Sequence, residues 1–207
     1  MKYKNKLSVI LQGNHIGLYI YELHILKMTD SRFSEDIQGF LDKVTTKEFL
    51  ACAKQFTDLL ETPDIPNEVF YKAAHSALVK LYAAGHALEE INLKYSVDAD
   101  FDRNEFFQSK DRNQISELGK DSFYSEVFDP VNEDDKEPSQ GWLVDDFSDI
   151  YRDLKIELTK IETIGTEKAV EDALWQMKWS YLNHWGQHAI SALRALHFLF
   201  YEGKHVM

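Results

Sequence analysis

The most regular part of the sequence is TEKAVEDALWQMKWSYLNHWGQHAISALRALHFLFY, residues 166–201. Its core-type side chains recur every three or four residues, which is the spacing of one face of an α-helix. Thr166 is a residue type that caps helix N-termini, and Gly165 is suited to end a preceding helix. The stretch predicts one long helix, or two helices broken near Gly186. The residues on its recurring face are Val170, Leu174, Met177, Tyr181, His184, His188, Ala192, Ala195 and Leu199.

Further helices are predicted on the N-terminal side of this stretch. Residues 143–161 show the same spacing, and residues 7–28 fit either a hairpin or a helix. No internal repeat and no other alternating strand pattern is found. The chain is therefore predicted to be all-α, a single-domain helical bundle of five to seven helices. The other predicted helices are a short one through residues 37–44, one from Thr45 with a Thr45–Glu48 capping box, one of about 25 residues capped by Asn67, and one from Asp102 to Gly119.

The helical domain is predicted to cover residues 37–207, with residues 1–36 as an N-terminal extension whose structure the pattern leaves open. Inside the domain, residues 120–141 contain two prolines and a run of three acidic residues, which is typical of an irregular acidic loop. Gly85 lies inside the helix that follows Pro66. It costs that helix about 1 kcal/mol relative to alanine, unless another helix packs closely there.

The charge of the chain is concentrated in one segment. The 207 residues carry a net charge of −12, and residues 98–153 alone hold 17 acidic and 6 basic residues. Binding to nucleic acid requires clustered Lys and Arg side chains that neutralise phosphates, and no such cluster is present. An acidic surface instead attracts a basic protein partner. We therefore expect no nucleic-acid partner.

The cysteine content and the hydropathy bear on compartment. Cys52 is the only cysteine, which excludes an internal disulfide and a multi-cysteine metal site. Residues 7–21 are uncharged but contain Gln, Asn and His, and are too short and too polar to span a bilayer. We therefore expect a cytoplasmic protein with no membrane partner.

Five motifs carry a family resemblance, namely YSEVFDP (124–130), DDFSDIYRDLK (145–155), ALW (173–175), HWGQ (184–187) and ALRALH (192–197). Read in order along the chain, they resemble the bacterial domain-of-unknown-function family numbered 5063, closely from about Leu118 onward and more loosely over residues 40–91. The resemblance implies a helical cytoplasmic protein without an established activity. His184 and His188 stand where the family is expected to carry an aromatic and a basic residue, so they are interpreted as features of this chain.

Asp146, Asp149 and Asp153 fall within a narrow arc of one predicted helix. Like charges at this spacing repel each other and need a cationic partner. Arg194 and His197, in an apolar run near the C-terminus, are the predicted partners. Three interpretations stay open. The five side chains form a structural polar network, or a pocket for a small molecule or phosphate centred on Arg194, or the aspartates hold a hard cation such as Mg²⁺.

His184 and His188 have the i, i+4 spacing of two metal ligands on one helix face. The glutamate of a metalloprotease motif is missing, and both residues lie on the apolar stripe, where hydrogen-bonded core histidines are common. They are therefore predicted to be core residues, with no metal and no other cofactor. Beside them, residues 175, 179, 182 and 186 form a second stripe (Trp, Trp, Leu, Gly), which indicates a central helix or an exposed aromatic patch for a partner.

The sequence favours a non-enzymatic helical protein that binds another protein through an acidic surface, as an adaptor or immunity protein does. The reasons are the segregated charge and the lack of a recognisable catalytic motif. The alternative is a metal-dependent hydrolase of a phosphorylated small molecule. In that case Asp146, Asp149 and Asp153 would hold the cation, and Arg194 would bind the phosphate. No feature of the sequence indicates an oligomeric state.

Overall fold

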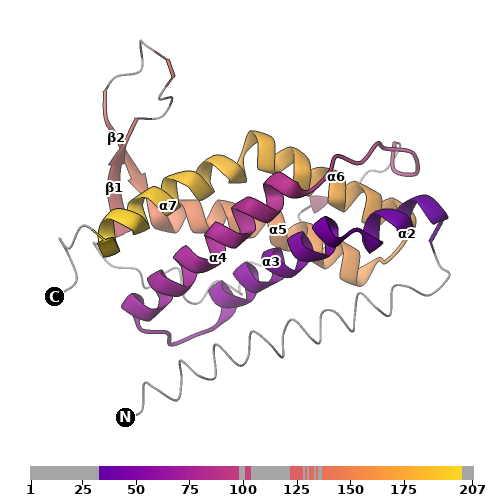
Figure 1. Ribbon diagram of the computed structural model, residues 1–207, viewed down its shortest axis with the longest axis horizontal. Helices are drawn as coiled ribbons and strands as arrows, with labels where there is room; N and C mark the ends of the chain where they lie inside the picture. Colours follow the sequence, from indigo (N-terminus) through magenta and orange to yellow (C-terminus); the bar gives the residue numbers. More distant parts are fainter. Residues whose placement is uncertain are drawn as a thin grey trace.

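The computed structural model describes residues 33–97, 101–103, 122–127, 129, 131, 132, 134 and 137–201 (Figure 1). Over these residues the chain forms six helices and a small two-stranded sheet, so the predicted helical bundle is confirmed. The N-terminal question over residues 7–28 and nearly all of the helix predicted from residue 102 to 119 lie outside the described residues. In chain order the elements are α2 (Glu35–Asp42), α3 (Val44–Glu61), α4 (Asn67–Ala87), β1 (Phe123–Glu126), β2 (Ser139–Trp142), α5 (Leu143–Thr163), α6 (Glu167–Asn183) and α7 (Trp185–Tyr201).

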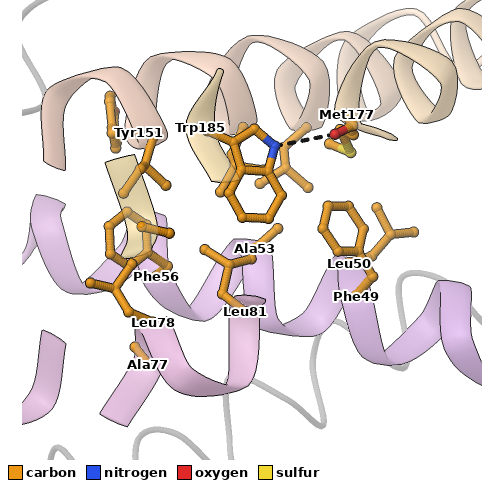
Figure 2. Packing of buried hydrophobic residues seen from close by; sticks show 14 of the residues in the cluster. Phe49, Leu50, Ala53, Phe56, Ala77, Leu78, Leu81, Tyr151, Met177 and Trp185 are labelled. Atoms are coloured by element: carbon orange, nitrogen blue, oxygen red, sulfur yellow. Dashed lines mark hydrogen bonds between the residues drawn. The ribbon is translucent and has the colours of Figure 1, made fainter. Parts of the chain in front are cut away.

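The core forms where α7 packs against α4, α5 and α6, and where α3 packs against α4 and α5. Trp185 at the start of α7 is fully buried in this core (Figure 2). Its indole Nε1 donates a hydrogen bond to the backbone oxygen of Met177 at 3.1 Å. Phe49 of α3 stacks against the indole, with ring centroids 6.2 Å apart. Because the only polar atom of the indole is hydrogen-bonded, the ring is buried without an unsatisfied group.

Gly85 of α4 packs directly against this tryptophan, which is the close helix packing that would explain a glycine inside α4. A Cβ atom at residue 85 would lie 2.6 Å from Cη2 of Trp185 and 2.9 Å from Cδ2 of Tyr181. The lack of a side chain therefore lets α4 approach the start of α7.

Gly85→Ala is expected to destabilise the protein by about 1–3 kcal/mol, because the overpacking outweighs the better helix propensity of alanine. The matched control is Gly39→Ala in α2, where an added Cβ would meet nothing within 4 Å. The control is expected to gain about 0.5–1 kcal/mol. Thermal and urea unfolding of both variants measure the difference, and equal stability of the two would contradict the close packing of α4 on Trp185.

The predicted N-caps of α3 and α4 are wrong. α3 begins at Val44 with Lys43 in the cap position, so Thr45 lies in the first turn and makes no capping bond. Lys43 is the single residue between α2 and α3, and the end of α2 therefore sets where α3 begins. α4 begins at Asn67, one residue earlier than predicted, with Pro66 in the cap position.

The boundaries around α6 agree with the prediction. Gly165 has a φ of +58°, the left-handed conformation expected after a helix end. The Thr166 side chain accepts a hydrogen bond from the third backbone N–H of α6. The stretch of residues 166–201 forms two helices, and the break between them falls at His184, whose φ is −148°. A Cβ on Gly186 would collide with the carbonyl oxygen of Tyr181, so this sharp break requires a glycine there.

The segment predicted as an irregular acidic loop contains strands β1 and β2. They pair antiparallel and form a hairpin that projects from one end of the bundle (Figure 1). Phe123 lies opposite Trp142, and Tyr124 lies opposite Gly141. The strands have only four residues each, which is too short for an alternating sequence pattern to reveal them.

The second stripe of α6 faces solvent in part. Trp179 and Leu182 are exposed, and the Trp179 ring stacks on the half-buried Trp175. The central-helix interpretation of this stripe is therefore wrong at these two exposed positions.

Among the described residues, no helix is both long and apolar enough to cross a membrane.

Candidate functional site

Three carboxylates lie on α5 where it packs beside the α6–α7 break. Asp146 keeps only 4% of its surface exposed, Asp153 is similarly buried, and Asp149 is half-buried. Their spacing of three and four residues places them along one side of the helix. Buried carboxylates are costly unless they have hydrogen-bond partners or opposite charges. The groups that meet them therefore determine what this site can do.

Two histidines meet the three carboxylates. His188 of α7 places Nδ1 2.9 Å from Oδ1 of Asp146 and Nε2 3.4 Å from Oδ2 of Asp149. His184, at the break between α6 and α7, places Nδ1 2.8 Å from Oδ2 of Asp153. The two imidazole rings are nearly perpendicular, with centroids 5.0 Å apart. Each histidine therefore uses Nδ1 to contact its own aspartate.

The hairpin adds a tyrosine to the site. The Tyr124 hydroxyl of β1 donates a hydrogen bond to Oδ2 of Asp146 at 2.6 Å. The Tyr124 ring passes over Gly141 on β2, so closely that a Cβ on Gly141 would collide with it. The glycine opposite Tyr124 thus allows the ring to cross the partner strand, and Tyr124 anchors the hairpin to α5.

Burial and hydrogen bonding shift the protonation equilibria of these groups. Burial raises the pKa of Asp146, while its hydrogen bonds with His188 and Tyr124 act in the opposite direction. The hydrogen bond with Asp146 raises the pKa of His188, against the effect of its burial. Burial, followed by the hydrogen bond to Asp146, raises the pKa of Tyr124, which keeps the hydroxyl a donor. Asp146 and His188 therefore titrate as a linked pair.

The predicted pairing of Arg194 with the aspartates is wrong. Arg194 is exposed, and the described residues contain no carboxylate in an ion pair with it. Ala192 and Leu196 lie on the buried face of α7, and a residue two positions from each of them points roughly 200° away around the helix. His197 is also exposed, and its ring lies 6.3 Å from that of His75 on α4.

A buried polar network continues from Asp153 along α5. Nη2 of Arg103 lies 3.5 Å from both Oδ1 of Asp153 and Oε1 of Glu157. Glu157 is fully buried, and its Oε2 lies 2.5 Å from Nζ of Lys160, which also pairs with Asp172 of α6. Burial is the main cause that raises the pKa of Glu157 to about 7. This network joins α5 to α6 and lies toward the C-terminal end of α5 from the candidate site.

One set of three side chains in the described part of the chain is spaced to hold a cation. Asp149, His184 and His188 each offer a ligand atom, and these atoms all lie within 4.8 Å of one another. The sequence contained a signal for the histidines, namely their i, i+4 spacing. It contained none for Tyr124, because its contact with Asp146 depends on the hairpin register.

Comparison with known proteins supports the fold. A family model described as "Domain of unknown function (DUF5063)" matches residues 41–202. The crystal structure of protein BF1032 from Bacteroides fragilis is similar, with a TM-score of 0.64 and 20% sequence identity. The similarity covers 81% of this chain and 99% of that one. No curated protein matches the sequence. At this identity, the structural similarity shows the fold alone.

Proposed function

The chain belongs to the DUF5063 family, a domain of unknown function, and we propose that it acts by binding a basic protein partner through the β1–β2 hairpin. The role is that of an adaptor or an immunity-like protein. The observation that carries the proposal is a pair of stacked, exposed aromatic rings on a projecting, acidic hairpin.

Phe123 and Trp142 form the outward face of the hairpin. Their side chains are 48% and 42% exposed, and their rings stack with centroids 5.5 Å apart and planes inclined by 10°. They lie opposite each other in the strand register, while Tyr124 and Gly141 form the face directed toward α5. The hairpin is thus held to the bundle on one face and presents a rigid aromatic surface on the other. Aromatic side chains of this kind dominate the binding energy of many protein interfaces.

The negative charge of the hairpin determines which class of protein it attracts. Residues 123–142 contain six acidic residues and one basic residue. An arginine or lysine side chain from a partner could lie over the aromatic rings, while the acidic residues farther along the hairpin attract other basic groups of the same partner. Such a surface attracts a basic protein and repels an acidic one.

The hydrolase alternative lacks its phosphate-binding group. It placed Arg194 beside the aspartates, and Arg194 is exposed on the far side of α7. In the ion pairs of the described residues, Arg103 is the arginine that meets the α5 carboxylates, and it contacts Asp153 and Glu157. A carboxylate-rich site with its nearby arginine engaged by carboxylates is poorly suited to bind a phosphate.

A photo-crosslinking residue at position 123, introduced in the native host, is expected to capture a basic protein. The same residue at position 179, where Trp179 is equally exposed on α6, serves as the matched control and is expected not to capture it. With the purified partner, Phe123→Ala is expected to weaken binding about 10–30-fold, whereas Trp179→Ala leaves the affinity unchanged. Equal binding by both variants, or a captured partner with an acidic surface, would contradict the proposal.

A further inference from the structure

We propose that Asp149, His184 and His188 bind one divalent transition-metal ion. Asp146 and Asp153, the outer carboxylates, orient the two histidine ligands. This inference does not depend on what the hairpin binds. It departs from the sequence-based interpretation of both histidines as core residues without a metal.

The distances between the three side chains fit a single ion. Their ligand atoms lie within 4.8 Å of one another, and Nε2 of His188 is 3.4 Å from Oδ2 of Asp149. Two ligands that each lie about 2.1 Å from a tetrahedral zinc ion are separated by about 3.4 Å. The Asp149–His188 pair is therefore already at the spacing of two ligands, and a ring nitrogen of His184 lies within 4.8 Å of both.

The orientation of both imidazole rings is the stronger observation. Nδ1 of His188 lies 2.9 Å from Asp146, and Nδ1 of His184 lies 2.8 Å from Asp153. A carboxylate only accepts hydrogen bonds, so each Nδ1 carries a hydrogen, and in the neutral form that binds a metal each Nε2 has the lone pair. Metal-bound histidines almost always donate their second ring N–H to a carboxylate or carbonyl in this way. Here two histidines in this arrangement occur side by side, with the carboxylate of Asp149 within 4.8 Å of both.

The outer carboxylates are more firmly held than the ligands. The side chains of Asp146 and Asp153 are only 6% and 12% exposed, and the Tyr124 hydroxyl fixes the second oxygen of Asp146. The side chains of His184, Asp149 and His188 are more exposed, the first of them 44% exposed. The side chains of the ligands are thus partly exposed to solvent, while the groups that orient them are buried. This arrangement permits entry of an ion without unfolding.

The donor set selects the class of metal. Two imidazole nitrogens and one carboxylate oxygen suit Zn²⁺, Co²⁺, Ni²⁺ or Fe²⁺, whereas Mg²⁺ and Ca²⁺ prefer oxygen ligands throughout. The Mg²⁺ site considered from the three aspartates alone is therefore replaced by a transition-metal site. Three protein ligands also leave at least one coordination position for water.

The test uses the full chain without a histidine tag, stripped with EDTA and titrated separately with Zn²⁺, Co²⁺ and Mg²⁺ by calorimetry. One Zn²⁺ or Co²⁺ per chain is expected, with no stoichiometric Mg²⁺. Asp149→Asn and His184→Gln are each expected to weaken Zn²⁺ binding at least 100-fold. Asp146→Asn, which alters an orienting group, is expected to weaken it about 10–100-fold. The matched control is His75→Gln with His197→Gln, a neighbouring histidine pair outside the cluster, which should leave affinity unchanged.

A second measurement uses the unaltered protein and so does not depend on how a variant folds. Long-range ¹H–¹⁵N spectra of the imidazoles are expected to show the hydrogen on Nδ1 of His184 and His188 in the metal-free protein. Added Zn²⁺ should then shift their Nε2 resonances and leave those of His75 and His197 unchanged. The proposal is overturned if wild type binds no stoichiometric Zn²⁺ or Co²⁺, if binding survives Asp149→Asn combined with His184→Gln, or if the control pair responds instead.

Discussion

Lys160→Met is expected to lower the free energy of unfolding by about 3 kcal/mol at pH 8. Lys160 is 1% exposed, and its ammonium group contacts the carboxylates of Glu157 and Asp172 and lies 5.0 Å from the Phe101 ring. Methionine has a similar length and volume, so the substitution removes the charge more than the packing. Glu157 then remains buried without its closest cation, which is the most costly way to break such a pair. Urea unfolding followed by circular dichroism measures the loss.

The control for this prediction is Lys168→Met, which removes an exposed lysine from the first turn of α6. It should change the unfolding free energy by less than about 0.5 kcal/mol. The loss in Lys160→Met should also shrink as the pH falls from 8, because Glu157 can then bind a proton, and it binds one more readily when Lys160 no longer lowers its pKa. A loss below about 1 kcal/mol at pH 8 would mean that the buried pair contributes little to joining α5 and α6.

The wild-type protein is expected to lose stability relative to Glu157→Gln as the pH rises from about 4.5 to about 7. Burial raises the pKa of Glu157 from 4.5 to about 7, although Lys160 and Arg103 act in the opposite direction. A carboxyl group with a higher pKa in the folded state binds its proton more tightly there. Its contribution to stability is therefore fully present below pH 4.5 and is lost as the pH rises through 7. The change amounts to about 3 kcal/mol.

Glutamine has the shape of glutamate and does not titrate, so the difference between the two unfolding curves isolates this group. Urea unfolding at half-unit steps between pH 4.5 and pH 8 measures it. Parallel stabilities across this range would contradict the raised pKa. A wild type that gains stability relative to Glu157→Gln as the pH rises would show that the attraction of Lys160 outweighs burial.

The helices of the C-terminal half could be read from the sequence because their signals are local. The spacing of apolar residues located α5, α6 and α7, and the types of Gly165 and Thr166 located the boundary between the first two. The close packing at Gly85 was also predictable, since a glycine inside a helix is retained at a cost unless another element needs the space. Signals of this kind depend on neighbours within a few residues.

The candidate site was harder to predict because its contacts are not local. The charge of Arg194 suits it to pair with the aspartates, but its position relative to Ala192 places it on the exposed side of α7. His184 reaches Asp153 only because the chain breaks at that residue, and the backbone angles of the break are not encoded by helical spacing. Tyr124 reaches Asp146 through the strand register and the bare backbone of Gly141.

Asp149 of α5, His184 at the α6–α7 break and His188 of α7 are proposed to form one metal site. Crystals of the protein grown with Zn²⁺, measured above and below the zinc absorption edge, test it most directly. We expect one anomalous peak about 2.0–2.2 Å from Nε2 of His184, Nε2 of His188 and a carboxylate oxygen of Asp149. Absence of a peak there, with Asp146 and Asp153 still bonded to the histidines, would show that the cluster is a structural network and contradict the claim.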